Sequence, residues 1–248
     1  METALLAILI CYQGMMSILD VRDIKRLTSI EITEKIRIKY YKDTIIFGWI
    51  PVLIVLICIP ISQLNLQGIG FRRFDLSDNI WLNVITLIFA GILTLVLLYQ
   101  IVMYLSNEKY RDQIKNELDS KKEAGPHYDA VISKILIPKS ATEKRWFFFV
   151  SLTAGICEET VWRGCILFLL SNMFPSVNMI MICAISCVLF GLAHSYQGLH
   201  GIIKTSLIAI LFVLIYVATN SIFPGIVLHF FFDFSSAFLI KEERRSLH

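Results

Sequence analysis

Residues 146–170 read WFFFVSLTAGICEETVWRGCILFLL, an apolar run long enough to cross a lipid bilayer as a helix. Glu158 and Glu159 lie side by side in its middle, and Arg163 follows four residues after Glu159. An ionisable group at membrane depth costs roughly 2.5–3.5 kcal/mol even on the mildest insertion scale. Such groups usually pair with one another or mark a functional site, so the run predicts a membrane span with a site inside it.

The composition places the whole chain in a membrane. Hydrophobic residues make up 56% of the 248 residues and charged residues only 17%, and the mean hydropathy is +0.67, which excludes an ordinary soluble domain. We predict an all-α fold, a polytopic transmembrane helix bundle of about seven spans, with six and eight as alternatives. The predicted spans are Thr3–Leu19, Thr44–Ile61, Trp81–Leu105, Trp146–Leu170, Val177–His194, Ile202–Thr219 and Ile222–Ile240.

Basic residues predict the orientation of these spans. Seven Lys and Arg lie in Asp20–Asp43, nine in Ser106–Arg145 and three in the C-terminal tail, whereas Arg72 and Arg73 fall on the other side of the predicted membrane. Loops rich in Lys and Arg stay in the cytoplasm. We therefore expect a multi-pass protein of the cell membrane, with its N-terminus outside and its C-terminus cytoplasmic.

The positive charge itself indicates lipid and not nucleic acid. The net charge of +3 is explained by basic residues beside the membrane, where they face anionic lipid, and no nucleic-acid-binding module is visible. We divide the chain into N-terminal spans and a cytoplasmic hairpin loop (1–140), a catalytic helical membrane core (141–241) and a cytoplasmic tail (242–248). Within the loop, a turn is expected at Gly125–Pro126. The sequence does not indicate an oligomeric state.

The spacing of the charged residues predicts which of them pair. On a helix, Glu159 and Arg163 are neighbours one turn apart, whereas Glu158 points about 100° away and is left to face a cavity as a candidate general base. His229 and Asp233 have the same spacing in a later span, so the carboxylate can orient the imidazole or share a ligand with it. The structural alternative for Glu159 and Arg163 is an intramembrane bridge that only orients helices, and for His229 and Asp233 it is a buried hydrogen bond.

A third signal is His194, which ends the sequence Phe190-Gly191-Leu192-Ala193-His194. The ordered set formed by Glu158-Glu159-x-x-x-Arg163, Phe190-x-x-x-His194 and His229-x-x-x-Asp233 resembles the CAAX protease and bacteriocin-processing family of intramembrane peptidases, also called the Abi family. The resemblance covers roughly Trp146–Ile240.

The resemblance implies an intramembrane endopeptidase that hydrolyses a peptide bond in a membrane-associated protein or peptide. Glu158 would activate water with help from His194, while Glu159 and Arg163 shape the site. His229 and residue 233 would face the scissile carbonyl. The prenyl-protease branch of that family has an asparagine at the last position of the third motif. This chain has Asp233 there, which donates a hydrogen bond only when protonated.

A metal is the second interpretation of the same side chains. Glu158, His194 and His229, with Asp233 nearby, form a candidate zinc set that leaves one position for water. No His-Glu-x-x-His helix is present, and water activation by a carboxylate needs no metal, so a metal-free mechanism stays open.

Two non-hydrolytic alternatives use the same residues. A membrane scaffold or bacteriocin self-immunity protein can retain the fold without cleaving anything, and a proton or ion translocator also needs buried ionisable groups. The sequence shows no internal repeat of the kind expected for a transporter. The three motifs together favour the peptidase.

Overall fold

The computed structural model describes residues 1–62, 64–110, 113, 135–235 and 237, and within these ranges every regular element is a helix. The predicted all-α fold is therefore confirmed. The helices are α1 (Glu2–Leu27), α2 (Glu34–Cys58), η1 (Ile59–Ile61), α3 (Ile80–Ser106), α6 (Ala141–Glu158), η2 (Glu159–Ile166), α7 (Leu167–Met173), α8 (Met179–Ala193), η3 (Ser195–Gln197), α9 (Gly198–Thr219) and α10 (Phe223–Ser235).

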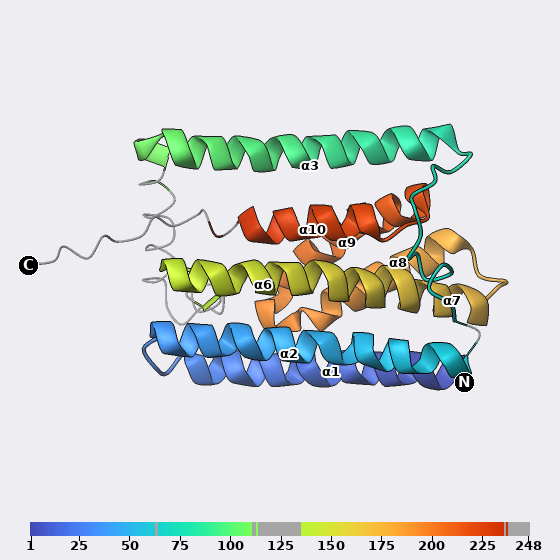
Figure 1. The fold of residues 1–248 in the computed structure, drawn as a ribbon, viewed down its shortest axis with the longest axis horizontal. Coiled ribbons are helices and arrows are strands. Elements are labelled where there is room, and N and C mark those ends of the chain that lie inside the picture. Colours follow the sequence, from blue (N-terminus) through green and yellow to red (C-terminus); the bar gives the residue numbers. More distant parts are fainter. Residues whose placement is uncertain (63, 111–112, 114–134, 236, 238–248) are drawn as a thin grey trace, which may run out of the picture.

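The long helices form a bundle along one common axis (Figure 1). In the described ranges, each of the seven predicted spans coincides with a helix or with the continuous helical run from α6 through η2 to α7. Among the residues that the structure describes, four helices are long and apolar enough to cross a membrane: α1, α2 with η1, the first part of α3, and η3 with α9. The apolar helices α8 and α10 are shorter. A count of about seven spans is approximately consistent with this bundle.

The basic regions that the structure describes lie at one end of the bundle. Figure 1 shows the N-terminus and the start of α3 at one end, with the α1–α2 connection, the end of α3 and the start of α6 at the other. The basic segment Asp20–Asp43 and the basic residues at the start of α6 thus share one end of the molecule. The orientation of that end toward the cytoplasm stays a prediction.

Side-chain caps explain where several helices begin. Thr33 accepts a hydrogen bond from the backbone N–H of Ile36 at the start of α2, and Asn79 does the same for Leu82 in α3. At the start of α6, Ser140 and Glu143 form a capping box. Glu143 also forms a buried ion pair with Arg37 of α2, which joins these two helices at the end of the bundle.

Some helix ends differ from the limits of the predicted spans. The helix α1 continues to Leu27, beyond the predicted Leu19, because polar and charged residues extend a helix readily once the apolar stretch has ended. The expected turn at Gly125–Pro126 and the tail 242–248 lie outside the described residues. The proposed division at residue 140 stays a prediction.

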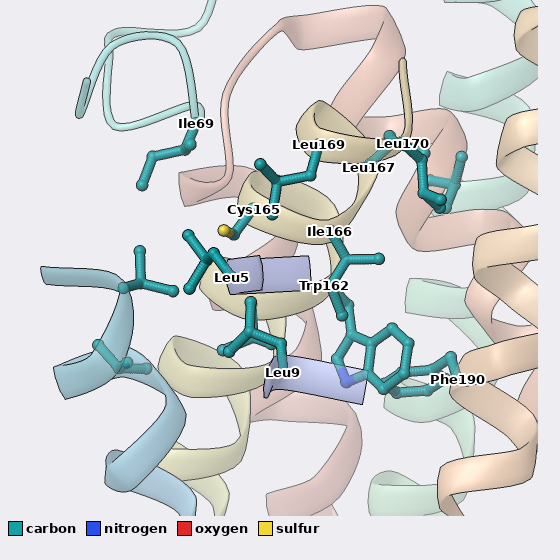
Figure 2. Packing of buried hydrophobic residues seen from close by; sticks show 14 of the residues in the cluster. Leu5, Leu9, Ile69, Trp162, Cys165, Ile166, Leu167, Leu169, Leu170 and Phe190 are labelled. Carbon is teal, nitrogen blue, oxygen red and sulfur yellow. The ribbon is translucent and has the colours of Figure 1, made fainter. Parts of the chain in front are cut away.

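The main hydrophobic core surrounds η2 and α7. In Figure 2, Leu5 and Leu9 of α1 approach Cys165 and Trp162, and Phe190 of α8 lies beside Trp162. The rings of Trp162 and Phe190 meet edge to face, with centroids 5.4 Å apart. All eight residues of η2 are buried, so the segment that carries Glu159 and Arg163 is held on every side by other helices.

A loop between α2 and α3 closes this core. The Cβ of an alanine at position 164 would lie only 2.6 Å from the backbone oxygen of Ile69, so Gly164 allows the loop to touch η2 directly. Gly155 allows a similar close approach, because a Cβ at this position would lie 2.9 Å from the backbone oxygen of Ile226. The backbone of α10 is thereby brought against α6, within reach of the glutamate pair.

Candidate active site

The first motif lies where an α-helix changes into a π-helix. Glu158 is the last residue of α6, and Glu159 and Arg163 belong to η2, whose backbone follows the wider π pattern from Glu159 to Ile166. Such segments are rare and occur frequently at functional sites. At this change of helix type Glu159 is buried, with 1% of its side chain exposed, whereas 28% of the Glu158 side chain is exposed.

Glu159 is the centre of a buried hydrogen-bonded group. Its Oε1 atom accepts a hydrogen bond from Nη1 of Arg163 at 3.1 Å, as the spacing predicted. The same oxygen lies 2.9 Å from Nδ1 of His229 on α10. A carboxylate oxygen can only accept, so Nδ1 of His229 is the donor, which leaves Nε2 on the side of Glu158.

Aromatic rings enclose Arg163. The carbon Cζ of its guanidinium lies 4.4 Å from the ring centre of Phe190 and 5.2 Å from that of Phe212. Among the described residues, its Nη2 atom has no hydrogen-bond partner. Phe212 also lies 4.9 Å from the ring centre of His229, so this residue of α9 contacts both partners of Glu159.

His194 comes to the site from the end of α8. Its Nδ1 atom lies 2.9 Å from the backbone oxygen of Phe190. A carbonyl oxygen can only accept, so Nδ1 carries the hydrogen, and Nε2 is an acceptor in the neutral ring. The helix ends here, and η3 continues the chain through Ser195–Gln197.

Glu158 faces both histidines. Its Oε2 atom lies 3.9 Å from Nε2 of His194 and 3.8 Å from Nε2 of His229. These separations are too long for direct hydrogen bonds and suit a shared water molecule. Asp233 completes the group, with Oδ2 at 3.7 Å from Nε2 of His229. Two imidazole nitrogens and two carboxylates thus converge from three separate parts of the chain.

The structure brings together all six residues that the sequence singled out: Glu158, Glu159, Arg163, His194, His229 and Asp233. Their roles in a reaction stay predictions. The bond from His229 to Glu159, however, was not foreseen, since the spacing suggested Asp233 as the residue that orients the ring. Nor did the sequence single out Phe212, because one phenylalanine in an apolar run gives no distinguishing signal.

The arrangement gives the zinc prediction no support. The ligand atoms of a tetrahedral zinc site lie roughly 3.4 Å apart, given bonds of about 2.0–2.2 Å. The gaps of Glu158 to the two histidines are wider, at 3.8 and 3.9 Å. In the part of the chain that the structure describes, no set of three or more His, Cys, Asp and Glu is arranged to hold a metal ion.

Fold and site together define a helical membrane protein with convergent carboxylates and imidazoles. Residues 141–235 match the family model "Rce1-like", described as type II CAAX prenyl endopeptidase Rce1-like. The match confirms the resemblance that the three motifs indicated and, at the level of the family, supports a membrane protease. Comparisons with curated proteins and with solved structures found no match.

Proposed function

We propose that this protein is an intramembrane endopeptidase in which Glu158 activates the water that attacks a peptide bond. The observation that carries the proposal is the position of the Glu158 carboxylate. It lines a cavity together with His194 and lies within 4 Å of two imidazole nitrogens whose other nitrogens are already hydrogen-bonded. A base beside fixed imidazoles is an arrangement suited to proton transfer.

The reaction then needs two proton transfers. Glu158 takes a proton from a water molecule held between its carboxylate and Nε2 of His194, and the resulting hydroxide attacks the scissile carbonyl carbon. Protonated Glu158 later gives that proton to the leaving amine as the carbon–nitrogen bond breaks. The products are an amine and a carboxylic acid, which then loses its proton to water or to the amine, and the general base is restored for the next cycle.

His229 is proposed to stabilise the oxyanion that forms on the carbonyl oxygen. A protonated His229 donates from Nε2, which faces Glu158, while Nδ1 donates to Glu159. The carboxylates of Glu158, Glu159 and Asp233, all within 3.8 Å of the ring nitrogens, balance the positive charge. Preorganised donors of this kind supply a large part of the catalysis of acyl transfer.

The experiment is cleavage of a library of membrane-spanning peptides in vesicles that contain the purified protein. Products are identified by mass, with wild type compared against Glu158→Gln and against Glu34→Gln, an exposed carboxylate at the start of α2. We expect cleavage by wild type and by Glu34→Gln only. Prenylated and unprenylated peptides are tested in parallel, because the family description names prenyl endopeptidases.

A zinc chelator forms a second arm of the experiment. Cleavage that continues in the chelator supports the metal-free mechanism given above, whereas loss of cleavage that added zinc restores would contradict it. Equal cleavage by wild type and Glu158→Gln would overturn the role of Glu158. Absence of cleavage with every peptide would favour the scaffold or self-immunity alternative.

A further inference from the structure

The cavity beside the candidate active site has a volume of about 330 Å³ and extends well beyond the catalytic groups. Its lining combines α1, α2 and α6 with the segment that follows α8. Besides Glu158 and His194, it includes Asp20, Asp23 and Asp43, and none of the described residues that line it is Lys or Arg. The cavity is therefore acidic at the catalytic group and also along the walls that lead away from it.

Contacts between helices show how far each aspartate lies from the site along the axis of the bundle. Ser17 of α1 lies level with His194, because its Oγ is 2.6 Å from Oγ of Ser195 and 3.3 Å from the oxygen of Leu192. Asp20 and Asp23 follow Ser17 by three and six residues, so they lie about 4.5 and 9 Å farther along the axis of α1. Both lie on the side of the site nearer the α1–α2 connection.

Asp43 marks the far end of the same path. The helices α2 and α6 run in the same direction: the ring of Tyr41 contacts that of Phe147, and Gly48 lies against Thr153 farther along. Asp43 comes five residues before Gly48, and Glu158 five residues after Thr153. The two carboxylates are thus separated by about 15 Å along the bundle.

Two of the three aspartates are free to bind a partner of opposite charge. Among the residues that the structure describes, Asp20 and Asp23 form no ion pair, and Asp43 has only a 3.7 Å pair with Lys39, which is 80% exposed. An exposed pair of this kind is weak and easily exchanged. The apolar residues between them, such as Met16, Leu19 and Phe47, suit the aliphatic stem of a long basic side chain.

We propose that this cavity selects peptides with Lys or Arg within about five residues of the scissile bond, on the side nearer the α1–α2 connection. The inference rests on the proposed function, since it takes Glu158 as the point of cleavage. An extended peptide advances about 3.3 Å per residue. A basic residue one to three positions from the scissile bond therefore reaches Asp20 or Asp23, and one at the fourth or fifth reaches Asp43.

The predicted orientation agrees with this preference. If the basic end of the bundle faces the cytoplasm, the aspartates meet the cytoplasmic flank of a membrane peptide. That flank is where Lys and Arg gather in membrane segments. The aspartates of the cavity then bind the Lys and Arg that membrane segments generally carry on this flank. These carboxylates have no part in the hydrolysis itself.

The test uses three membrane-spanning peptides that differ only in having Lys, Gln or Glu three residues from the cleaved bond, in vesicles of neutral lipid. Wild type is compared with the double variant Asp20→Asn/Asp23→Asn. The matched control is Asp75→Asn/Asp78→Asn, which removes two exposed carboxylates at the opposite end of the bundle. We expect a KM about tenfold lower for the Lys peptide than for the Gln peptide in wild type and in the control.

The cavity variant should lose this difference while cleaving the Gln peptide as wild type does, which also shows that it is folded. Asp20→Lys should reverse the order and favour the Glu peptide. Equal KM values for all three peptides in wild type, with cleavage still abolished by Glu158→Gln, would overturn this inference and leave the proposed function standing. If no peptide is cleaved in a manner that depends on Glu158, the proposed function fails and this inference fails with it.

Discussion

The Nδ1 atom of His229 lies 2.9 Å from Oε1 of Glu159, although 70 residues separate them in the sequence. The same oxygen accepts a hydrogen bond from Arg163. One buried carboxylate therefore holds the side chains of the first and third motifs in a fixed relation. Glu158, one residue earlier, remains on the cavity wall. The two adjacent glutamates thus have different surroundings: Glu159 is buried in a hydrogen-bonded group, and Glu158 lines the cavity.

Replacement of Glu159 should destabilise the protein strongly. Glu159→Gln leaves Arg163, which is 1% exposed, with an uncompensated buried charge, and breaking such a pair costs about 3–5 kcal/mol. Chemical unfolding in detergent gives the change in the free energy of unfolding. Lys39→Gln is the control, because the exposed Lys39–Asp43 pair is worth at most about 1 kcal/mol. Equal effects of the two substitutions would contradict the central position of Glu159.

Replacement of Glu158 should show the opposite pattern. Glu158→Gln removes the proposed base from a position that is 28% exposed and forms no short hydrogen bond with the histidines. We expect the rate of cleavage to fall by about 10²–10⁴-fold, with the free energy of unfolding within about 1 kcal/mol of wild type. Cleavage rate and unfolding are measured on the same preparation. A large loss of stability would make Glu158 a structural residue.

Gly225 should be intolerant of even one added methyl group. A Cβ at this position would lie 3.0 Å from Oε2 of Glu159 and 3.4 Å from its Cδ, so Gly225→Ala must displace the carboxylate that holds His229. We expect a loss of about 1–3 kcal/mol in the free energy of unfolding together with reduced cleavage.

Gly91→Ala is the matched control for position 225, since a Cβ at this helical position meets nothing within 4 Å. It should be neutral or slightly stabilising, because alanine favours a helix more than glycine does. If Gly225→Ala behaves in the same way, the packing of α10 against Glu159 is looser than the structure indicates.

Phe212 should act as a positioning residue. Its ring lies over the guanidinium of Arg163 and beside the ring of His229. Phe212→Leu keeps an apolar side chain but removes both ring contacts, which are worth about 1–2 kcal/mol when desolvated. We expect kcat to fall about tenfold with little change in KM, and Phe212→Tyr to recover most of the rate. The exposed Phe231 provides the control, Phe231→Leu; the same loss there would show that Phe212 has no special role.

The sequence was a good guide to features with a strong physical contrast. Charged residues inside apolar runs stand out because they are costly in a membrane, which is how Glu158 and His229 were found. The pairing of Glu159 with Arg163 followed from helical spacing. The all-helical fold followed from the length and the number of the apolar runs.

Other relations depend on which helices become neighbours, and spacing along one helix does not contain that information. The bond between His229 and Glu159 forms only because α10 lies directly against α6, an approach that Gly155 and Gly225 allow. The π-helical backbone from Glu159 to Ile166 has no sequence pattern of its own. The residues that line the cavity could not be predicted from the sequence either. Asp20 and Asp43 belong to a segment of mixed charge, and nothing in that segment distinguishes them from its other charged residues.

The cavity beside the candidate site is lined by two stretches of chain, and the family match covers one of them. The proposed hydrolytic groups all lie within 141–235, the part that matches the Rce1-like family, whereas much of the opposite wall comes from α1 and α2. Under the proposals made above, bond cleavage and the choice of peptide are encoded separately. A lineage that exchanges its first two helices can thus acquire new targets while it inherits the cleavage chemistry intact.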